Sequence, residues 1–442
     1  MTHPPAWDRM ERLRVLEVIG AVLEHAASNG AVAACLDLPD LALLGNPDMI
    51  SSLPDDILIN ILSLMTVREA AVTDVLSTRW RHLWESVDHF ILDMHTFGMQ
   101  VPPNSDNHGN LDFWNSEATK FVGKVNELLS HHKGNKLKEF KVEFPLSSAH
   151  ASELDRWVAF AVASHAETLT LSLCDEHGRV ATDHTEAYVF PLKQFSDVGG
   201  CQLHVLSLCK CILETVPANL NGFSYLYSLS LCHVRMVDEV LLSIMSSCNA
   251  LHNLYLRACH KLIDLRASRA QLVNLEVHWC QRLRSISIHA EKMESFSYTS
   301  RRADIEFECA PVLCELTACF RGMWHHTLAL LDKFPNKLKM LTLPCSSRLQ
   351  ASRVLKHNGR FAVLKEITWC VRAWKKSIRI VALVLQAAPL VETLNLEVHG
   401  NLRPQKMLKI RWPKNFTAAS LRTIRIEGFS GEPKLVKFLL FL

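Results

Sequence analysis

The sequence has few of the features that define catalytic or membrane proteins. Glycine is scarce, at 16 of 442 residues, so glycine-rich phosphate-binding loops are not expected to organise the fold. No window reaches about 18 consecutive uncharged apolar residues, which predicts no membrane span. The first apolar stretch, residues 15–23, is short, carries Glu17 and is followed by no clear cleavage signal, so no secretory signal peptide is expected. These absences favour an intracellular protein of the cytoplasm, the nucleus or both.

An excess of charge of one sign is also missing. The chain has 48 Lys and Arg residues against 45 Asp and Glu, a formal net charge of +3, which gives no electrostatic case for binding nucleic acid or an anionic membrane. The 14 cysteines are scattered without paired Cys-x-x-Cys motifs, and Cys209–Lys210–Cys211 alone is weak evidence for zinc. We therefore expect no metal, no other cofactor and no disulfide framework.

Catalytic motifs are absent as well. The sequence has no Gly-x-Ser-x-Gly elbow, no phosphate-binding loop and no His-Glu-x-x-His helix, so no catalytic residue is assigned and the chain is not expected to be an enzyme. The pairs His131–His132 and His325–His326 point apart on a helix or strand, so they are expected to be solvent-exposed rather than chelating. Trp369 and Trp374 lie near basic residues, and we favour packing over binding of phosphate or RNA.

What the sequence does contain is a repeat. An apolar residue is followed three positions later by a second apolar residue, and two positions after that by a third. From Leu203 to Leu421 the successive starts lie 20–30 residues apart. This period is typical of leucine-rich repeats, in which each unit adds one strand and stacked neighbours bury a shared core. The starts are Leu137, Ala166 (a degenerate copy), Leu203, Leu226, Leu251, Leu272, Met293, Leu313, Leu338, Leu364, Val391 and Leu421.

The repeat assigns roles to three cysteines and to one row of polar residues. Cys211, Cys259 and Cys280 each lie eight residues after a repeat start, where this repeat class uses Asn or Cys to turn the chain and bond neighbouring backbone. Side chains alternate along a strand, so the residues between the apolar ones project onto the concave face. We predict that this face binds the target. The row includes Asn253, Tyr255 and Arg257 in one unit and Asn274, Glu276 and His278 in the next.

Upstream of the repeats, the pattern predicts three short helices. Pro54 suits the first helical position, and two aspartates follow it where the helix dipole favours carboxylates. Thr66 and Glu69 have capping-box spacing for a second helix, and Ser77 is suited to cap a third. The predicted organisation is an extension over residues 1–47 with one amphipathic helix (8–26), the helical segment (48–90), a connector with a helix (91–136), the repeat solenoid (137–427) and a C-terminal segment (421–442).

The helical segment closely resembles a plant-type F-box. The matching pieces are Ile50–Leu58, Ile61–Ser63, Glu69–Ala70, Val75–Ser77 and Arg79–Trp84, an ordered combination over about forty residues that chance explains poorly. Leu421–Gly431 is similar to the entry of the domain called FBD in plant F-box proteins, a domain that normally continues beyond this point. The chain thus resembles the plant F-box/leucine-rich-repeat (F-box/LRR/FBD-like) family. The resemblance implies an α+β multi-domain fold, with a small three-helix F-box followed by an α/β leucine-rich-repeat solenoid that has a parallel concave sheet.

The resemblance implies an adaptor role. F-box segments dock a SKP-family adaptor in a cullin–RING (SCF-type) ubiquitin ligase, and the repeats recruit the target protein. So small a helical unit cannot bury all its apolar surface alone, and exposed apolar patches usually mark a partner. About half of the candidate residues are nevertheless expected to pack inside the F-box, since three helices need a core. The candidates are Leu53, Pro54, Ile57, Leu58, Ile61, Leu62, Val75, Leu76, Trp80, Leu83 and Trp84.

Two alternatives to the adaptor role stay open, and departures from the family pattern support the second of them. Met65 stands where the family usually has Pro, Val72 where it has Arg, and Asp74 where it has a small residue. A buried, unpaired carboxylate at Asp74 would cost several kcal/mol, unless it faces solvent or pairs with Arg68 or Arg79. One alternative is a sensor in which a small ligand or polyphosphate fills the concave face. The other is a repeat scaffold with a degenerate F-box and no ligase role.

Overall fold

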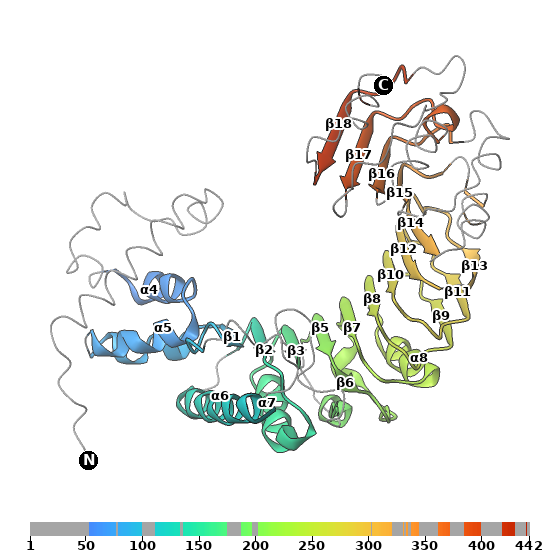
Figure 1. Ribbon diagram of the computed structural model, residues 1–442. Helices are drawn as coiled ribbons and strands as arrows, with labels where there is room; N and C mark the ends of the chain where they lie inside the picture. The colour runs from blue at the N-terminus through green and yellow to red at the C-terminus, as the bar shows by residue number, and fades with distance from the viewer. Residues whose placement is uncertain are drawn as a thin grey trace. The chain divides into compact units, whose positions relative to one another are not determined.

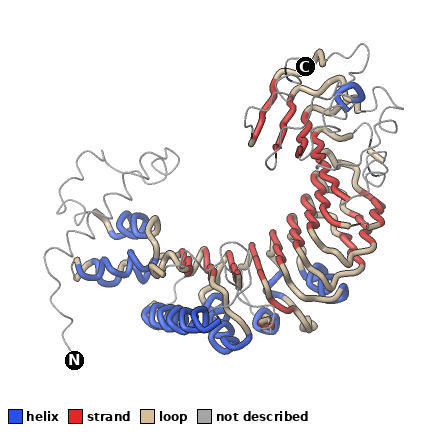
Figure 2. The backbone as a smooth tube through the Cα atoms, in the orientation of Figure 1, coloured by secondary structure: helices blue, strands red, loops and turns tan. Residues whose placement is uncertain are grey.

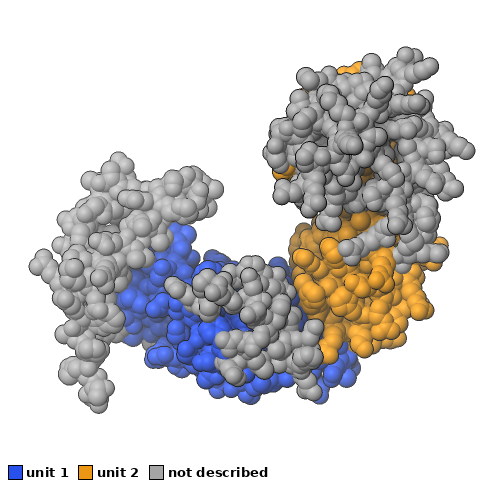
Figure 3. All heavy atoms as spheres, in the orientation of Figure 1, with its two compact units in different colours: residues 1–226 blue, residues 227–442 orange. Residues whose placement is uncertain are grey.

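A computed structural model of the chain describes most of the predicted F-box and repeats. The described residues are 53–76, 78–99, 111–132, 136–174, 187–196, 202–301, 303–320, 330, 333–334, 337–343, 361–371, 384–398, 418–428 and 439. The helix predicted at 8–26, the Ser77 cap and His325–His326 lie outside them. The chain divides into two compact units, residues 1–226 and 227–442 (Figure 3). No helix in the described ranges is long and apolar enough to cross a membrane.

The first unit begins with the short helices predicted for residues 48–90. Its elements are, in order, α4 (Asp55–Leu62), α5 (Val67–Val72) and the 3-10 turns η2 (Thr73–Val75), η3 (Trp80–His82) and η4 (Trp84–Ser86). Helices α4 and α5 agree with the prediction, although Pro54 stands at the N-cap rather than inside the helix. In place of one third helix the chain forms separate 3-10 turns. Residues three apart share a face of such a turn, and Trp80 and Leu83 are accordingly both buried.

Parallel strands and covering helices complete the first unit. Its strands, in the order β1-β2-β3-β5, are β1 (His89–Asp93), β2 (Glu139–Glu143), β3 (Thr168–Ser172) and β5 (Val205–Cys209). Helices α6 (Leu111–His131) and α7 (Ala151–Ala163) lie on one side of these strands (Figure 1). Phe121 of α6 stacks on Phe144 with ring centroids 4.3 Å apart, and Trp157 Nε1 of α7 donates a hydrogen bond to Asn126 Oδ1 at 2.9 Å. The first contact holds α6 against the end of β2, and the second joins α7 to α6. The minor elements are η5 (Ser148–His150), η6 (Leu192–Phe195), η7 (Asn221–Phe223) and the short parallel pair β4 (Tyr188–Val189) and β6 (Cys211–Ile212).

The second unit continues the same plan with a second layer of strands. Its main sheet runs β7-β8-β10-β12-β14-β15-β16-β17-β18 in parallel. The bounds are β7 (Ser228–Cys232), β8 (Asn253–Arg257), β10 (Asn274–His278), β12 (Ser295–Ser300), β14 (Glu315–Phe320), β15 (Met340–Leu343), β16 (Glu366–Val371), β17 (Thr393–Val398) and β18 (Thr423–Glu427). Helix α8 (Asp238–Ser247) and a second sheet of β9 (Asp264–Ser268), β11 (Ser285–His289) and β13 (Asp304–Cys309) form the opposite side (Figures 1 and 2). In three successive repeats, the segment that leads from one main-sheet strand to the next therefore also contains a strand.

The predicted repeat is confirmed position by position. Every predicted start, the degenerate copy at Ala166 included, lies two residues before a strand of a main sheet. All of these starts except Leu421 are buried, with at most 3% of their surface exposed. Each strand then alternates between buried and outward residues, as in β8, where the side chains of Leu254 and Leu256 enter the core. Burial of this repeating apolar set against the next unit drives the stacking.

One strand extends the repeat towards the N-terminus, before the predicted start at Leu137. Val87, Phe90 and Leu92 follow the same apolar spacing, and all three are buried. Strand β1 contains the last two of them and pairs in parallel with β2, from His89–Glu139 to Asp93–Glu143. The spacing signal was present in the sequence, inside the segment attributed to the F-box and its connector.

The predicted role of the repeat cysteines is confirmed for Cys259 and Cys280, whereas the Cys211 thiol donates to the Cys209 carbonyl of its own repeat at 3.6 Å. The Cys259 thiol is buried and donates to the carbonyl of Leu231, 28 residues earlier, at 3.4 Å. The Cys280 thiol reaches the carbonyl of Leu256 at 4.0 Å. The residues just before the two cysteines, Ala258 and Trp279, have positive φ angles of 53° and 63°. The left-handed residue turns the chain out of the strand, and the thiol then satisfies a backbone carbonyl of the preceding repeat.

Candidate functional site

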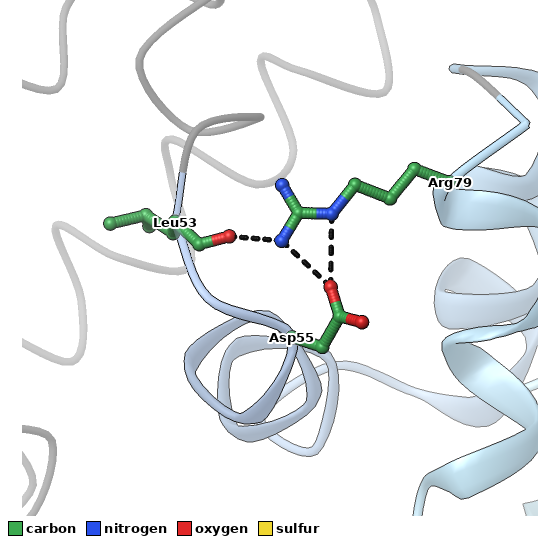
Figure 4. A network of polar contacts seen from close by, with 3 residues as sticks. All are labelled: Leu53, Asp55 and Arg79. Carbon is green, nitrogen blue, oxygen red and sulfur yellow. Dashed lines mark hydrogen bonds and ion pairs between the residues drawn. The ribbon is translucent and has the colours of Figure 1, made fainter.

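Two surfaces are candidates for binding partners, and the first is the helical segment before β1. Arg79 closes this segment by reaching the start of α4 (Figure 4). Its Nε and Nη2 donate to Asp55 Oδ1 at 2.9 and 2.7 Å, and its Nη2 also donates to the carbonyl of Leu53. Because both side chains are substantially exposed, 38% and 62%, this ion pair contributes at most about 1 kcal/mol. Its main effect is to fix the geometry of the chain around Leu53.

The start of α5 is fixed by the predicted capping box. Thr66 Oγ1 accepts a hydrogen bond from the Glu69 backbone N–H at 3.2 Å, and Glu69 Oε2 accepts one from the Thr66 backbone N–H at 3.0 Å. Two backbone donors without an intrahelical partner are satisfied reciprocally. Val67 and Ala70 then face the interior of the segment.

The structure divides the predicted adaptor-binding residues into a core and a surface. Leu58, Ile61, Leu62, Trp80, Leu83 and Trp84 are buried. Pro54 is exposed, and Leu53, Ile57 and Leu76 are half-buried. The side chain of Val75 lies outside the described set. The buried residues act through the packing of the helices, and the surface residues have side-chain area available to a partner. Direct adaptor contact by either group stays a prediction.

The three positions that depart from the family pattern occupy different environments. Met65 is buried with 8% exposure, so it fills a core position. Val72 is 36% exposed at the end of α5. Asp74 is half-buried in η2. Asp74 as a whole is therefore not fully buried, although one of its carboxylate oxygens, Oδ1, is.

The second candidate surface is the row of outward residues on β8 and β10. The two strands pair in register, so Asn253, Tyr255 and Arg257 lie beside Asn274, Glu276 and His278. None of these six side chains belongs to the buried core, whereas the leucine and valine residues between them do. The structure thus brings all six together on one face.

Polar contacts order this row. Asn274 Nδ2 donates to Asn253 Oδ1 at 2.6 Å, across the two strands. His278 Nε2 and Glu276 Oε2 are 3.2 Å apart. Partial burial, with the neighbouring Glu276 carboxylate, raises the pKa of Tyr255, so the phenol stays protonated and can donate. The face offers amide, carboxylate, imidazole, guanidinium and phenol groups, which suits hydrogen bonding to a polar partner.

One sequence expectation about histidine is wrong. His132 was expected to be exposed with its neighbour, but it is only 8% exposed, and its ring lies 4.7 Å from Phe90, edge to face. Burial lowers the pKa of His132. His131 is exposed at the end of α6, as expected, and its Nδ1 donates to the Glu127 carbonyl at 2.8 Å. The last turn of α6 brings His132 over the β1 side chains, which the helix pattern alone did not indicate.

The remaining sequence candidates are the two tryptophans near basic residues and possible metal ligands. Trp369 is 1% exposed within β16, which supports packing over a binding role for that ring. Trp374 lies outside the described ranges. Within those ranges, no group of three or more His, Cys, Asp or Glu side chains is arranged to hold a metal ion.

Comparison with known proteins covers both candidate surfaces. Residues 50–92 match the F-box domain, and residues 128–441 match the family described as At1g61320/AtMIF1, LRR domain. F-box protein At5g03100 of Arabidopsis thaliana is 28% identical over 289 residues, which cover 64% of this chain and 79% of the relative. F-box/LRR-repeat protein At3g03360 of Arabidopsis thaliana is 30% identical over 239 residues, 52% and 43% of the two chains. F-box/FBD/LRR-repeat protein At1g13570 of Arabidopsis thaliana is 28% identical over 218 residues, 49% and 46% of the two chains.

A short helical segment joined to stacked parallel repeats defines a plant-type F-box/leucine-rich-repeat protein. The chain belongs to the family of the At1g61320/AtMIF1 leucine-rich-repeat domain, whose match spans most of its length. It covers less than half of the last two relatives described above. The repeat match runs through residues 421–442 as far as 441, and the FBD-like character of that segment stays a prediction.

Proposed function

We propose that this protein is the substrate-recognition subunit of an SCF-type ubiquitin ligase. Its F-box docks a SKP-family adaptor, and through it a cullin–RING ligase, while the repeats bind the protein to be ubiquitinated. It performs no chemical step itself, needs no cofactor and acts in the cytoplasm or the nucleus. The observation that carries the proposal is the F-box match over residues 50–92, followed in the same chain by the repeat-domain match over residues 128–441.

The packing of the F-box supports this role. A core of buried leucine, isoleucine and tryptophan side chains holds the helices together, so the segment has a defined shape before it meets a partner. Leu53 and Pro54 lie next to the Arg79–Asp55 pair, which fixes the local backbone. Ile57 and Leu76 add half-buried apolar area. Fixed apolar groups at the surface lose little entropy on binding, which favours their use in an interface.

Adaptor binding is tested by co-purification with a SKP-family adaptor. The double variant Leu53→Ala/Leu76→Ala removes surface apolar area without emptying the core, and it should bind the adaptor at least tenfold more weakly, a loss of about 1.4 kcal/mol. Leu64→Ala/Val72→Ala is the matched control, because both residues are exposed, 38% and 36%, in the same F-box segment but outside the predicted surface. Equal loss in both variants would reject the assigned surface. No binding by the unmodified, folded chain would favour the repeat scaffold.

Target binding is tested separately on the repeats. Proteins captured by the chain, with proteasome and neddylation inhibited, are compared between the unmodified chain and Tyr255→Ala/Arg257→Ala. Arg266→Ala is the control, since Arg266 is exposed on the second sheet. We expect loss of target proteins with retention of ligase components. Retention of every captured protein by the double variant would exclude this part of the face. The sensor alternative instead requires capture to depend on an added small molecule.

A further inference from the structure

The ends of two paired strands in the first unit bring two thiols into contact. Cys174 follows β3, and Cys209 is the last residue of β5. Their sulfur atoms are 3.2 Å apart, although 35 positions separate the residues in the chain. Either thiol can donate to the other, and the Cys174 sulfur also lies 3.4 Å from Ser172 Oγ. A disulfide requires sulfur atoms about 2.05 Å apart, so the two sulfur atoms must approach by about 1 Å to bond.

The backbone around this thiol pair is held by the sheet. Ser172 pairs in register with Cys209, and the Leu173 N–H donates to the Cys209 carbonyl at 3.2 Å. Strand alternation directs Cys209 to the same face as Val205 and Ser207, away from the buried Leu206 and Leu208. The pair therefore joins a thiol on the outward face of β5 to one that is 6% exposed.

We propose that Cys174 and Cys209 are a redox-sensitive pair that forms a reversible disulfide when the protein meets a peroxide. The Cys209 sulfur attacks the O–O bond, forming a sulfenic acid and releasing one water. The Cys174 sulfur then attacks the Cys209 sulfur, the S–O bond breaks, the S–S bond forms, and a second water leaves with the thiol proton. Two thiols and one hydrogen peroxide thus give one disulfide and two waters. A small thiol or dithiol reductant reverses the reaction by exchange.

A third thiol lies nearby but is not equivalent. Cys211 is 0% exposed, and its Sγ donates to the Cys209 carbonyl at 3.6 Å. Burial raises the pKa of Cys211 to about 12, so it stays a protonated, structural thiol. Since the thiolate is the nucleophile, Cys211 does not compete with the half-buried Cys209 for oxidant. Cys232, half-buried at the end of β7, occupies the same strand position in the next repeat.

Peptide mapping of the full chain tests the proposal. The protein is exposed to graded hydrogen peroxide, its remaining thiols are blocked by alkylation, and a non-reducing digest is analysed by mass spectrometry. We expect a Cys174–Cys209 cross-linked peptide as the dominant product, removed by dithiothreitol. In Cys174→Ser, Cys209 should instead accumulate sulfenic acid that reacts with dimedone, and Cys232→Ala should form the cross-link unchanged.

A second measurement compares the melting temperatures of the oxidised and the reduced unmodified chain. A disulfide that closes a loop restricts the unfolded chain, so the oxidised protein should melt at a higher temperature than the reduced protein, and Cys174→Ser should lose this shift. Equal oxidation of Cys232 and Cys209 without the cross-linked peptide would overturn the proposal. A dominant Cys174–Cys211 cross-link would overturn the assignment of Cys209. The inference stands on the thiol geometry alone, so it does not depend on the proposed ligase role.

Discussion

Trp80→Ala distinguishes a core role for Trp80 from a contact role. The Trp80 side chain is 0% exposed, and truncating a buried tryptophan to alanine costs about 3–5 kcal/mol. A helical unit of about forty residues has a core that supplies about that much in total. We therefore expect Trp80→Ala to unfold the F-box locally while the repeats of the second unit stay folded.

Hydrogen exchange with mass spectrometry measures this effect directly. Amides of α4 and α5 should lose protection in Trp80→Ala, and amides of β8 and β10 should keep it, because local opening free energies differ between structural units. Leu64→Ala is the matched control, since Leu64 is 38% exposed in the same segment and its truncation should leave protection unchanged.

Adaptor binding gives the result that would refute the reasoning. Trp80→Ala should bind a SKP-family adaptor weakly because its helices are unfolded. If the variant keeps full amide protection in α4 and α5 but still loses the adaptor, Trp80 is a contact residue and its burial is not decisive. If Trp80→Ala keeps both its amide protection and its adaptor binding, the truncation costs less than the expected 3–5 kcal/mol, roughly the value for a buried tryptophan.

Three further predictions concern the cap, the buried histidine and the repeat cysteines. Thr66→Ala removes the capping-box hydroxyl and should destabilise α5 by about 1 kcal/mol in exchange measurements, whereas Thr66→Ser should not. Burial lowers the pKa of His132 from 6.5, so the contribution of the neutral imidazole to stability is present above about pH 6.5 and is lost as pH falls through that value towards the lowered native pKa. In His132→Gln, the fall of the melting temperature over this pH range should disappear. An unchanged dependence of melting temperature on pH would exclude His132 as its source. Cys259→Ala removes a buried thiol that bonds Leu231 and should cost about 1–2 kcal/mol in denaturant unfolding. Cys232→Ala, at a half-buried position, should cost less. Equal costs would remove the special role of Cys259.

The sequence alone determined the repeats and much of their internal chemistry. Apolar spacing gave the position of each strand, because a strand must place alternate residues in the core and each unit must repeat that set. The capping box at Thr66 and Glu69 is equally local, since both partners lie within one helical turn. The turn role of Cys259 followed from its fixed distance to the repeat start.

Tertiary structure decided which apolar and polar groups meet across the chain. Trp80 and Leu64 are both apolar residues of the F-box, yet one is buried and the other exposed, because burial depends on neighbouring segments. Arg79 pairs with Asp55 across 24 residues, and Cys174 meets Cys209 across 35. Local periodicity records which face of an element is apolar, but only the packed strands and helices determine which distant side chain lies against it.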